Sequence, residues 1–169
     1  MDTYCECLFK KKRTLKDNII AAVVIFAALI LLRYSVLLLV FPSVTFLAPA
    51  VWVGIIWGSF KLIKRQNKEY EYLLTGGDLD VDVVIAKSSR KRLFSVRRRE
   101  IEFVAHTSSD KAKEIDPNLP VTDVTSGYNP EAVYVMKISS STGNPIIYFE
   151  PSEKMLEQLK SKIPGKFFE

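Results

Sequence analysis

The sequence predicts an α+β protein: an N-terminal transmembrane α-hairpin followed by a small antiparallel β-barrel or sandwich that is capped by a C-terminal helix. Three observations support this fold class. Two long apolar segments lie between residues 18 and 63, alternating apolar and polar residues fill much of the chain after residue 70, and one helical apolar stripe closes it. The length of 169 residues suits one domain with additional segments.

These patterns divide the chain into four parts. We expect a basic cytoplasmic leader over residues 1–17, a helical hairpin over 18–63 with spans at about 18–40 and 44–63, a linker over 64–69, and a folded cytoplasmic domain over 70–169. The charge follows this division. Residues 1–68 hold ten Lys/Arg and three Asp/Glu, whereas residues 69–169 hold fourteen and sixteen.

The first apolar segment crosses a membrane only if it continues past Arg33. The uninterrupted run from Ile19 to Leu32 gives about 21 Å of helix, which is short of the roughly 30 Å hydrocarbon core, whereas extension to Val40 gives about 33 Å. A cleaved signal peptide is the rival interpretation. A second apolar segment follows directly and disfavours it.

Basic residues flank the hairpin on both sides. Their distribution predicts a two-pass protein of the inner (cytoplasmic) membrane with both termini in the cytoplasm. The residues before the first span are Lys10, Lys11, Lys12, Arg13 and Lys16, and those after the second are Lys61, Lys64, Arg65 and Lys68.

Two features inside the spans suggest contacts. Arg33 either extends its guanidinium to the outer headgroups or makes a polar contact in an oligomer or with another membrane protein. Ala50, Gly54 and Gly58 recur every four residues, which lets helices approach closely. We expect these three residues to pack against the first span, with a homodimer as the alternative.

The region after residue 69 reads as several antiparallel strands and one helix. Met155, Leu156, Leu159 and Ile163 form an apolar stripe at helical spacing, between a capping Ser152 and the Pro164-Gly165 stop. The strand patterns lie at residues 70–75, 79–87, 92–96, 99–106, 121–124, 132–138 and 145–150, with a hairpin turn over SSSTGN at 139–144.

This order of about seven strands and a terminal helix resembles the pleckstrin-homology-like fold. The whole chain is also similar to an uncharacterised family of small bacterial membrane proteins, mostly from Firmicutes, described as a domain of unknown function. The segments that carry the similarity are MDTYCECLFKKKRTLKD, EYEYLLTGGDLDVDVVIAKSSRKRLFSV and YFEPSEKMLEQLKSKIPGKFF. The resemblance implies a membrane-anchored domain and brings no activity with it. RRRE at residues 97–100 is more basic than that family leads us to expect.

The stretch KSSRKRLFSVRRRE carries the candidate site residues. Three roles compete: a charged strand edge that prevents aggregation, contact with anionic lipid headgroups, or binding of a nucleic acid or acidic protein. Because the C-terminal region is slightly acidic as a whole, binding of a nucleic acid is the least favoured of the three roles. The seven candidates are Lys87, Arg90, Lys91, Arg92, Arg97, Arg98 and Arg99.

No motif in the sequence points to an enzyme, a cofactor or a metal site. His106 stands without a second His or Cys nearby, and Cys5 and Cys7 lack the further ligands of a zinc site. The two thiols are interpreted as reduced groups in the leader, with lipidation as the alternative. We therefore expect a non-catalytic interaction module at the membrane. An accessory subunit of a larger membrane complex is the alternative, followed by a small membrane enzyme or a tethered nucleic-acid binder.

Overall fold

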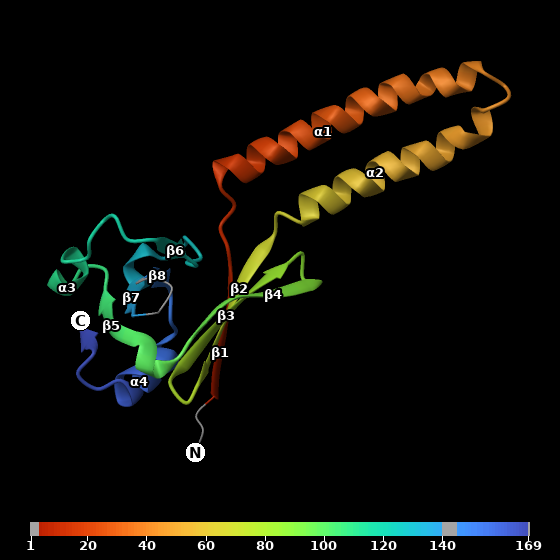
Figure 1. Cartoon of the computed structure of the whole chain (residues 1–169). Helices are drawn as coiled ribbons and strands as arrows, with labels where there is room; N and C mark the ends of the chain where they lie inside the picture. The colour runs from red at the N-terminus through yellow and green to blue at the C-terminus, as the bar shows by residue number, and fades with distance from the viewer. Residues whose placement is uncertain (1–3, 140–144, 169) are drawn as a thin grey trace. The chain divides into compact units, whose positions relative to one another are not determined.

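The computed structural model describes residues 4–139 and 145–168 and divides into two units (Figure 1). The β-rich unit comprises Met1–Lys12 and Lys68–Glu169, and the helical hairpin comprises Arg13–Asn67. The hairpin is therefore an insertion within the β-rich unit. The expected SSSTGN turn lies almost entirely outside the described residues.

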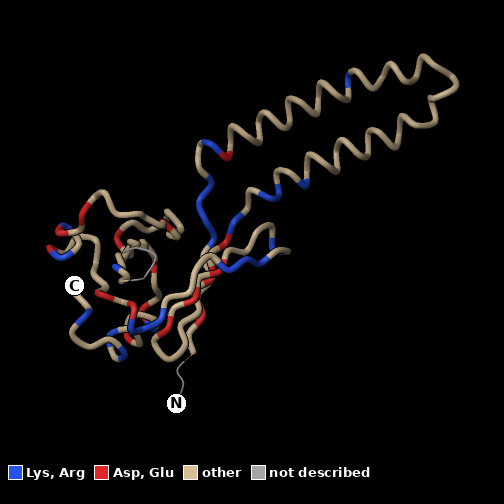
Figure 2. The backbone as a smooth tube through the Cα atoms, viewed as in Figure 1, with Lys and Arg blue, Asp and Glu red and all other residues tan. Residues whose placement is uncertain are grey.

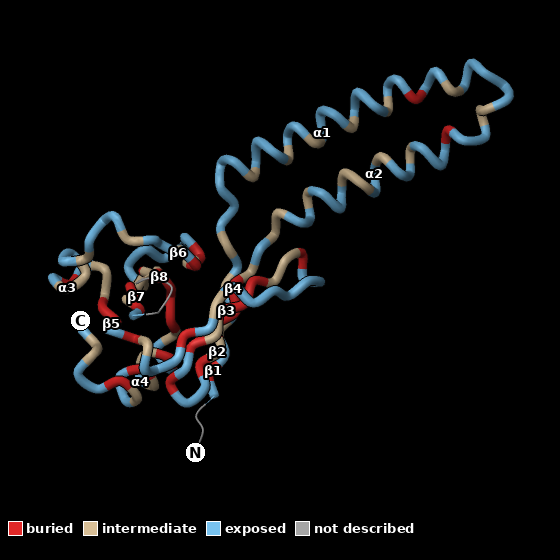
Figure 3. The backbone as a smooth tube through the Cα atoms, viewed as in Figure 1, coloured by how far each residue is buried: buried red, intermediate tan, exposed pale blue. Residues whose placement is uncertain are grey.

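The helical hairpin contains the two predicted apolar helices. They are α1 (Leu15–Ser35), which continues as the 3₁₀ helix η1 (Val36–Val40), and α2 (Ala48–Lys64), which the 3₁₀ helix η2 (Thr45–Leu47) precedes. Thr14 caps α1 in a reciprocal capping box with Asp17. Both helical segments are long and apolar enough to cross a membrane, by length and composition. Their residues are mostly exposed (Figure 3).

The β-rich unit contains two sheets. Sheet A has the order β1-β2-β3-β4 and is antiparallel throughout. Its strands are β1 (Tyr4–Lys10), β2 (Lys68–Thr75), β3 (Asp78–Ile85) and β4 (Ser89–Val96).

Sheet B has the order β6-β8-β7-β5-β9, with β5 and β9 parallel and β6 and β8 parallel. The sheets form no closed barrel among the described residues, so the barrel alternative is not observed. The strands are β5 (Ile101–His106), β6 (Val121–Asp123), β7 (Tyr134–Ile138), β8 (Ile146–Phe149) and β9 (Phe167–Phe168). The shorter helices between them are η3 (Arg98–Glu100), α3 (Asp110–Lys113) and η4 (Pro130–Ala132).

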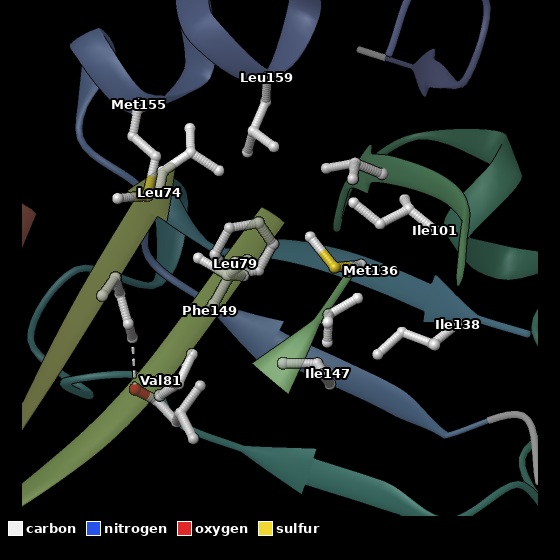
Figure 4. Close-up of a cluster of buried hydrophobic side chains, with 14 of the residues drawn as sticks. Leu74, Leu79, Val81, Ile101, Met136, Ile138, Ile147, Phe149, Met155 and Leu159 are labelled. Carbon is white, nitrogen blue, oxygen red and sulfur yellow. Dashed lines mark hydrogen bonds between the residues drawn. The ribbon is translucent and has the colours of Figure 1, made fainter. Parts of the chain in front are cut away.

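The main core lies between the sheets and under the last helix, α4 (Glu153–Lys162). Ser152 caps α4 as expected, and Met155 and Leu159 are fully buried. Figure 4 shows both side chains pointing toward Leu74 and the other core residues. Burying such side chains stabilises the fold by about 1.5–3 kcal/mol each.

The expected leader over residues 1–17 contains a strand of the folded unit, because Tyr4–Lys10 form β1. Tyr4 to Lys10 pair with β2 over seven positions, from Tyr4 opposite Thr75 to Lys10 opposite Glu69. Cys5 is 5 % exposed in the core, and Cys7 and Phe9 pack against the core from the same face. The inward-facing Cys5, Cys7 and Phe9 alternate with exposed residues along the strand, which belongs to the β-rich unit although it precedes the hairpin.

Candidate functional site

The strand register of sheet A brings basic residues together at one end of the sheet. Lys10 lies opposite Glu69, Glu69 opposite Val84 and Val84 opposite Arg90. The turn between β3 and β4 is therefore at the end of the sheet where the chain leaves for the hairpin and returns from it. We call this the basic end, and it carries Lys10, Lys11, Lys12, Lys68, Lys87, Arg90 and Lys91 (Figure 2).

The turn between β3 and β4 holds Lys87 in an exposed position. Ala86 and Lys87 have φ values of 54° and 57°, and the Ser88 N–H donates to the Ile85 carbonyl at 3.1 Å. Turns with two left-handed residues suit hairpins but favour Asn and Gly, so Ala86 and Lys87 each cost about 1–2 kcal/mol here. The tight turn places the Lys87 side chain at the tip of the basic end.

Two of the candidate arginines are held by carboxylates on the outer face of sheet A. Arg90 Nη2 lies 2.7 Å from Glu71 Oε2. Arg92 Nε lies 2.5 Å from Asp82 Oδ1, and its Nη1 lies 2.9 Å from Asp80 Oδ2. The side chains of Glu71 and Asp82 are only 3 % and 5 % exposed, so each requires its cationic partner. These arginines therefore stabilise the sheet.

The acidic side of this network extends to β1. Burial raises the pKa of Glu71, and a hydrogen bond with Glu6 raises it further, whereas Arg90 opposes the shift. A hydrogen bond from the Tyr4 hydroxyl, at 2.7 Å from Glu6 Oε2, lowers the pKa of Glu6. Glu6 and Glu71 are thus neighbouring carboxyl groups joined by a hydrogen bond. Because the pKa of Glu71 is raised and that of Glu6 is lowered, Glu71 takes up a proton first as the pH falls.

Lys87 and Lys91 differ from these arginines. Within residues 4–139 and 145–168, neither lysine makes an ion pair or a side-chain hydrogen bond, and both are exposed. Their ammonium groups are therefore available to an anionic surface.

The remaining candidates lie at the opposite end of β4. Val96 is opposite Leu79, and the seven residue steps from Arg90 to Arg97 extend about 23 Å along and just beyond the strand. Arg98 is structural: its N–H donates to Asp78 at 2.7 Å, and its side chain lies against Gly77. The contiguous basic run is therefore divided between two ends of the sheet. Arg97 also donates its backbone N–H to Glu100 Oε2 at 2.9 Å, and within the described residues the exposed side chains of Arg97 and Arg99 make no ion pair.

Two of the three small residues of α2 lie on its exposed side. The less exposed positions of α2 are Ala48, Trp52, Ile55, Gly58, Ser59 and Ile63, and the Trp52 indole N–H donates to Ser35 Oγ at 2.8 Å. By contrast, Ala50 and Gly54 are exposed, Gly58 is half-buried, and a Cβ added at either glycine meets no atom within 4 Å. Ala50 and Gly54 therefore do not make the expected contact with the first span, and for Gly58 the contact stays a prediction.

His106 is engaged on both ring nitrogens. Nδ1 lies 2.6 Å from Ser108 Oγ, and Nε2 lies 2.8 Å from the carbonyl of Glu131. A carbonyl only accepts, so Nε2 donates and Nδ1 is the acceptor for the Ser108 hydroxyl. These two hydrogen bonds hold the His106 ring in place in the turn at the end of β5.

The thiols also have structural surroundings. Burial raises the pKa of Cys5, and the Cys7 thiol donates to Ser152 Oγ at 2.8 Å. A raised pKa lowers the thiolate fraction, and the buried position of Cys5 closes it to acylation while β1 is paired. Among the described residues, no group of three or more His, Cys, Asp and Glu could hold a metal ion.

A groove of about 520 Å³ lies beside β1, and no predicted site residue lines it. Leu8 forms one wall, Tyr128 another, and Ser152 at the start of α4 a third. Glu150 is 4 % exposed and accepts from the Gly127 N–H at 3.3 Å. The alternation of β1 was the only sequence signal that could have located this groove.

Comparison with known proteins places the chain in a described family. The family described as bacterial PH-like domain (DUF6106) matches the chain over residues 1–169. No curated protein and no solved structure matches. The family covers β1, the hairpin and the rest of the β-rich unit as one sequence.

Proposed function

Because the chain belongs to the bacterial PH-like domain family, we propose that it is a membrane-anchored, non-catalytic interaction module. The hairpin spans the cytoplasmic membrane, the β-rich unit lies at its cytoplasmic face, and the basic end contacts anionic lipid headgroups.

The observation that carries the proposal is the pairing of the two strands that flank the hairpin. The Lys11 N–H donates to the Lys68 carbonyl at 3.0 Å, and within the hairpin Arg13 Nη2 donates to Asn67 Oδ1 at 2.9 Å. The two chain segments that enter and leave the hairpin therefore lie side by side. Only two residues lie between Lys12 and Leu15, so the three residue steps reach at most about 10 Å and the basic end stays close to the start of the first span.

The apolar surface of the hairpin supports membrane insertion. Its helices are exposed on most sides although they are rich in Leu, Ile and Val, and such surfaces suit lipid rather than water. The basic flanks favour the cytoplasmic side. Each basic residue near an anionic surface contributes about 1 kcal/mol, so Lys87 and Lys91 together contribute about 2 kcal/mol.

One observation favours the second candidate, an accessory subunit of a larger membrane complex. Ala50 and Gly54 form an open surface of α2, and small residues allow another membrane helix to approach. Copurification of a stoichiometric partner in mild detergent, lost on Gly54→Leu substitution, would support this alternative.

The lipid contact is tested with two matched double variants of the full-length protein in liposomes. Lys87→Gln with Lys91→Gln removes two free charges from the basic end, and Arg97→Gln with Arg99→Gln removes two from the opposite end. Hydrogen exchange is measured over the β3–β4 turn in zwitterionic bilayers and in bilayers with phosphatidylglycerol.

The wild type should exchange more slowly in the anionic bilayers, by up to about 30-fold for 2 kcal/mol at low salt. The lysine variant should lose this protection, and the arginine variant should keep it. Equal exchange in both bilayers, or equal losses in both variants, would exclude the proposed contact.

A further inference from the structure

The second helix of the hairpin is short for a membrane span. From Lys61, its charged residue nearest the turn, to Val44 there are seventeen residue steps, or about 25 Å of helix, against a hydrocarbon core of about 30 Å. With Lys61 at the near headgroups, the turn reaches the far headgroup layer if the bilayer becomes thinner or if the Lys61 side chain extends from within the hydrocarbon to the headgroups. Thinning is a known response to a short hydrophobic segment.

The turn itself has the chemistry of a membrane interface. Phe41 and Phe46 are 61 % and 75 % exposed, and the turn contains no charged residue. The Thr45 hydroxyl and the N–H groups of Val44 and Thr45 all donate to the Phe41 carbonyl, at 3.0–3.1 Å. The polar groups of the turn thus bond to one another while its aromatic rings point outward, which suits a headgroup layer better than an aqueous loop.

Arg33 lies close to this turn and points away from α2. It precedes Val40 by seven residues, or about 10 Å of helix. Ser35 faces α2 through its hydrogen bond with Trp52, and residues two apart are separated by about 200° around a helix, so Arg33 lies on the opposite face. Its exposed position agrees with this geometry.

The protein supplies no anion for Arg33. No Asp or Glu occurs between Asp17 and Glu69, and Arg33 makes no ion pair within residues 4–139 and 145–168. A second copy docked on this face would bring two arginines together and be repelled. A guanidinium surrounded by hydrocarbon requires an anionic partner, and lipid phosphates are the nearest ones.

We propose that Arg33 binds the phosphate of a phospholipid in the leaflet opposite the β-rich unit, and that the turn at residues 41–46 lies within that headgroup layer. The hairpin then thins the bilayer around itself and is anchored at both surfaces. This inference rests on the proposed function, because it requires the hairpin to be inserted in the membrane.

The test uses the full chain in phosphatidylglycerol liposomes. Solid-state NMR measures the dephasing of the Arg33 guanidinium ¹⁵N signal by ³¹P, with Arg33→Lys to assign the signal. The same protein in a phosphate-free glycolipid bilayer with inorganic phosphate in the buffer separates lipid phosphate from free phosphate. A spin label on Ser43→Cys, with Cys5→Ala and Cys7→Ala, reports the depth of the turn.

We expect ³¹P dephasing in phosphatidylglycerol, none in the glycolipid, and a label at phosphate depth. A membrane-inserted protein without dephasing, dephasing by free phosphate alone, or a label in bulk water would overturn this inference and leave the proposed function standing. Release of the chain from membranes by alkaline carbonate would overturn both.

Discussion

The hairpin can be removed without removing a strand, because residues 13–67 lie between two strands that pair with each other. We predict that a shortened protein in which Asn-Gly joins Lys12 to Lys68 folds cooperatively, since the Lys11–Lys68 pair already sets a hairpin geometry. A chain that starts at Lys68 lacks β1. It loses the buried Cys5 and the partly buried Cys7 and Phe9, at a cost of about 4 kcal/mol.

Urea unfolding followed by tyrosine fluorescence measures the difference, because both tryptophans lie in the deleted hairpin. With a slope of about 1.5 kcal/mol/M, the midpoint should fall by about 2.5 M. Phe9→Ala and Leu8→Ala in the joined protein are matched controls on opposite faces of β1. The first should cost about 2 kcal/mol and the second under about 0.5 kcal/mol. Equal midpoints with and without β1 would refute the assignment of this strand to the fold.

Two further predictions concern the core and the hairpin. Tyr72→Phe should lower the free energy of unfolding by about 1–3 kcal/mol in the joined protein. The hydroxyl of the fully buried Tyr72 donates to the Val124 carbonyl at 2.6 Å, and its loss leaves that acceptor unpaired. An unchanged urea midpoint would contradict this. Gly54→Leu should leave the tryptophan emission maximum of the full chain in micelles unchanged, because residue 54 is exposed and a Cβ added there meets no atom within 4 Å. A shift would show that the helices pack through Gly54.

Much of the fold follows from local patterns in the sequence. The apolar helices, the strands β2 to β5 and α4 each contain enough residues for a period of 3.6 or 2 to stand out. β1 is not predicted from the sequence because two of its inward residues are cysteines, which are interpreted as reduced thiols of the leader or as lipidation sites. Cysteine packs as a small apolar residue, so the pair belongs to the alternating pattern of the strand. β9 has two residues, Phe167 and Phe168, and no period can be read from so few.

The candidate site could be predicted only in part. All seven residues stood as equal candidates in the charge pattern. Within the described residues Lys87 and Lys91 make no ion pair, whereas Arg90 and Arg92 pair with carboxylates on neighbouring strands, which the local sequence does not reveal. Arg97 and Arg99 follow them closely along the chain and yet lie at the far end of β4. Successive residues on a strand are about 3.3 Å apart along its length, so basic residues at the two ends of β4 do not form one compact patch.

The position of the insertion constrains membrane topology independently of charge. If α1 crosses a bilayer, the chain must return through α2, because Lys68 has to reach the β1 strand that precedes the hairpin. An odd number of crossings would place β1 and β2 on opposite sides and leave seven residue pairs of the ladder unformed. If the hairpin spans a membrane, the β-rich unit should complete sheet A only once both spans have inserted, and its core residue Cys5 should become protected from alkylation only at that stage.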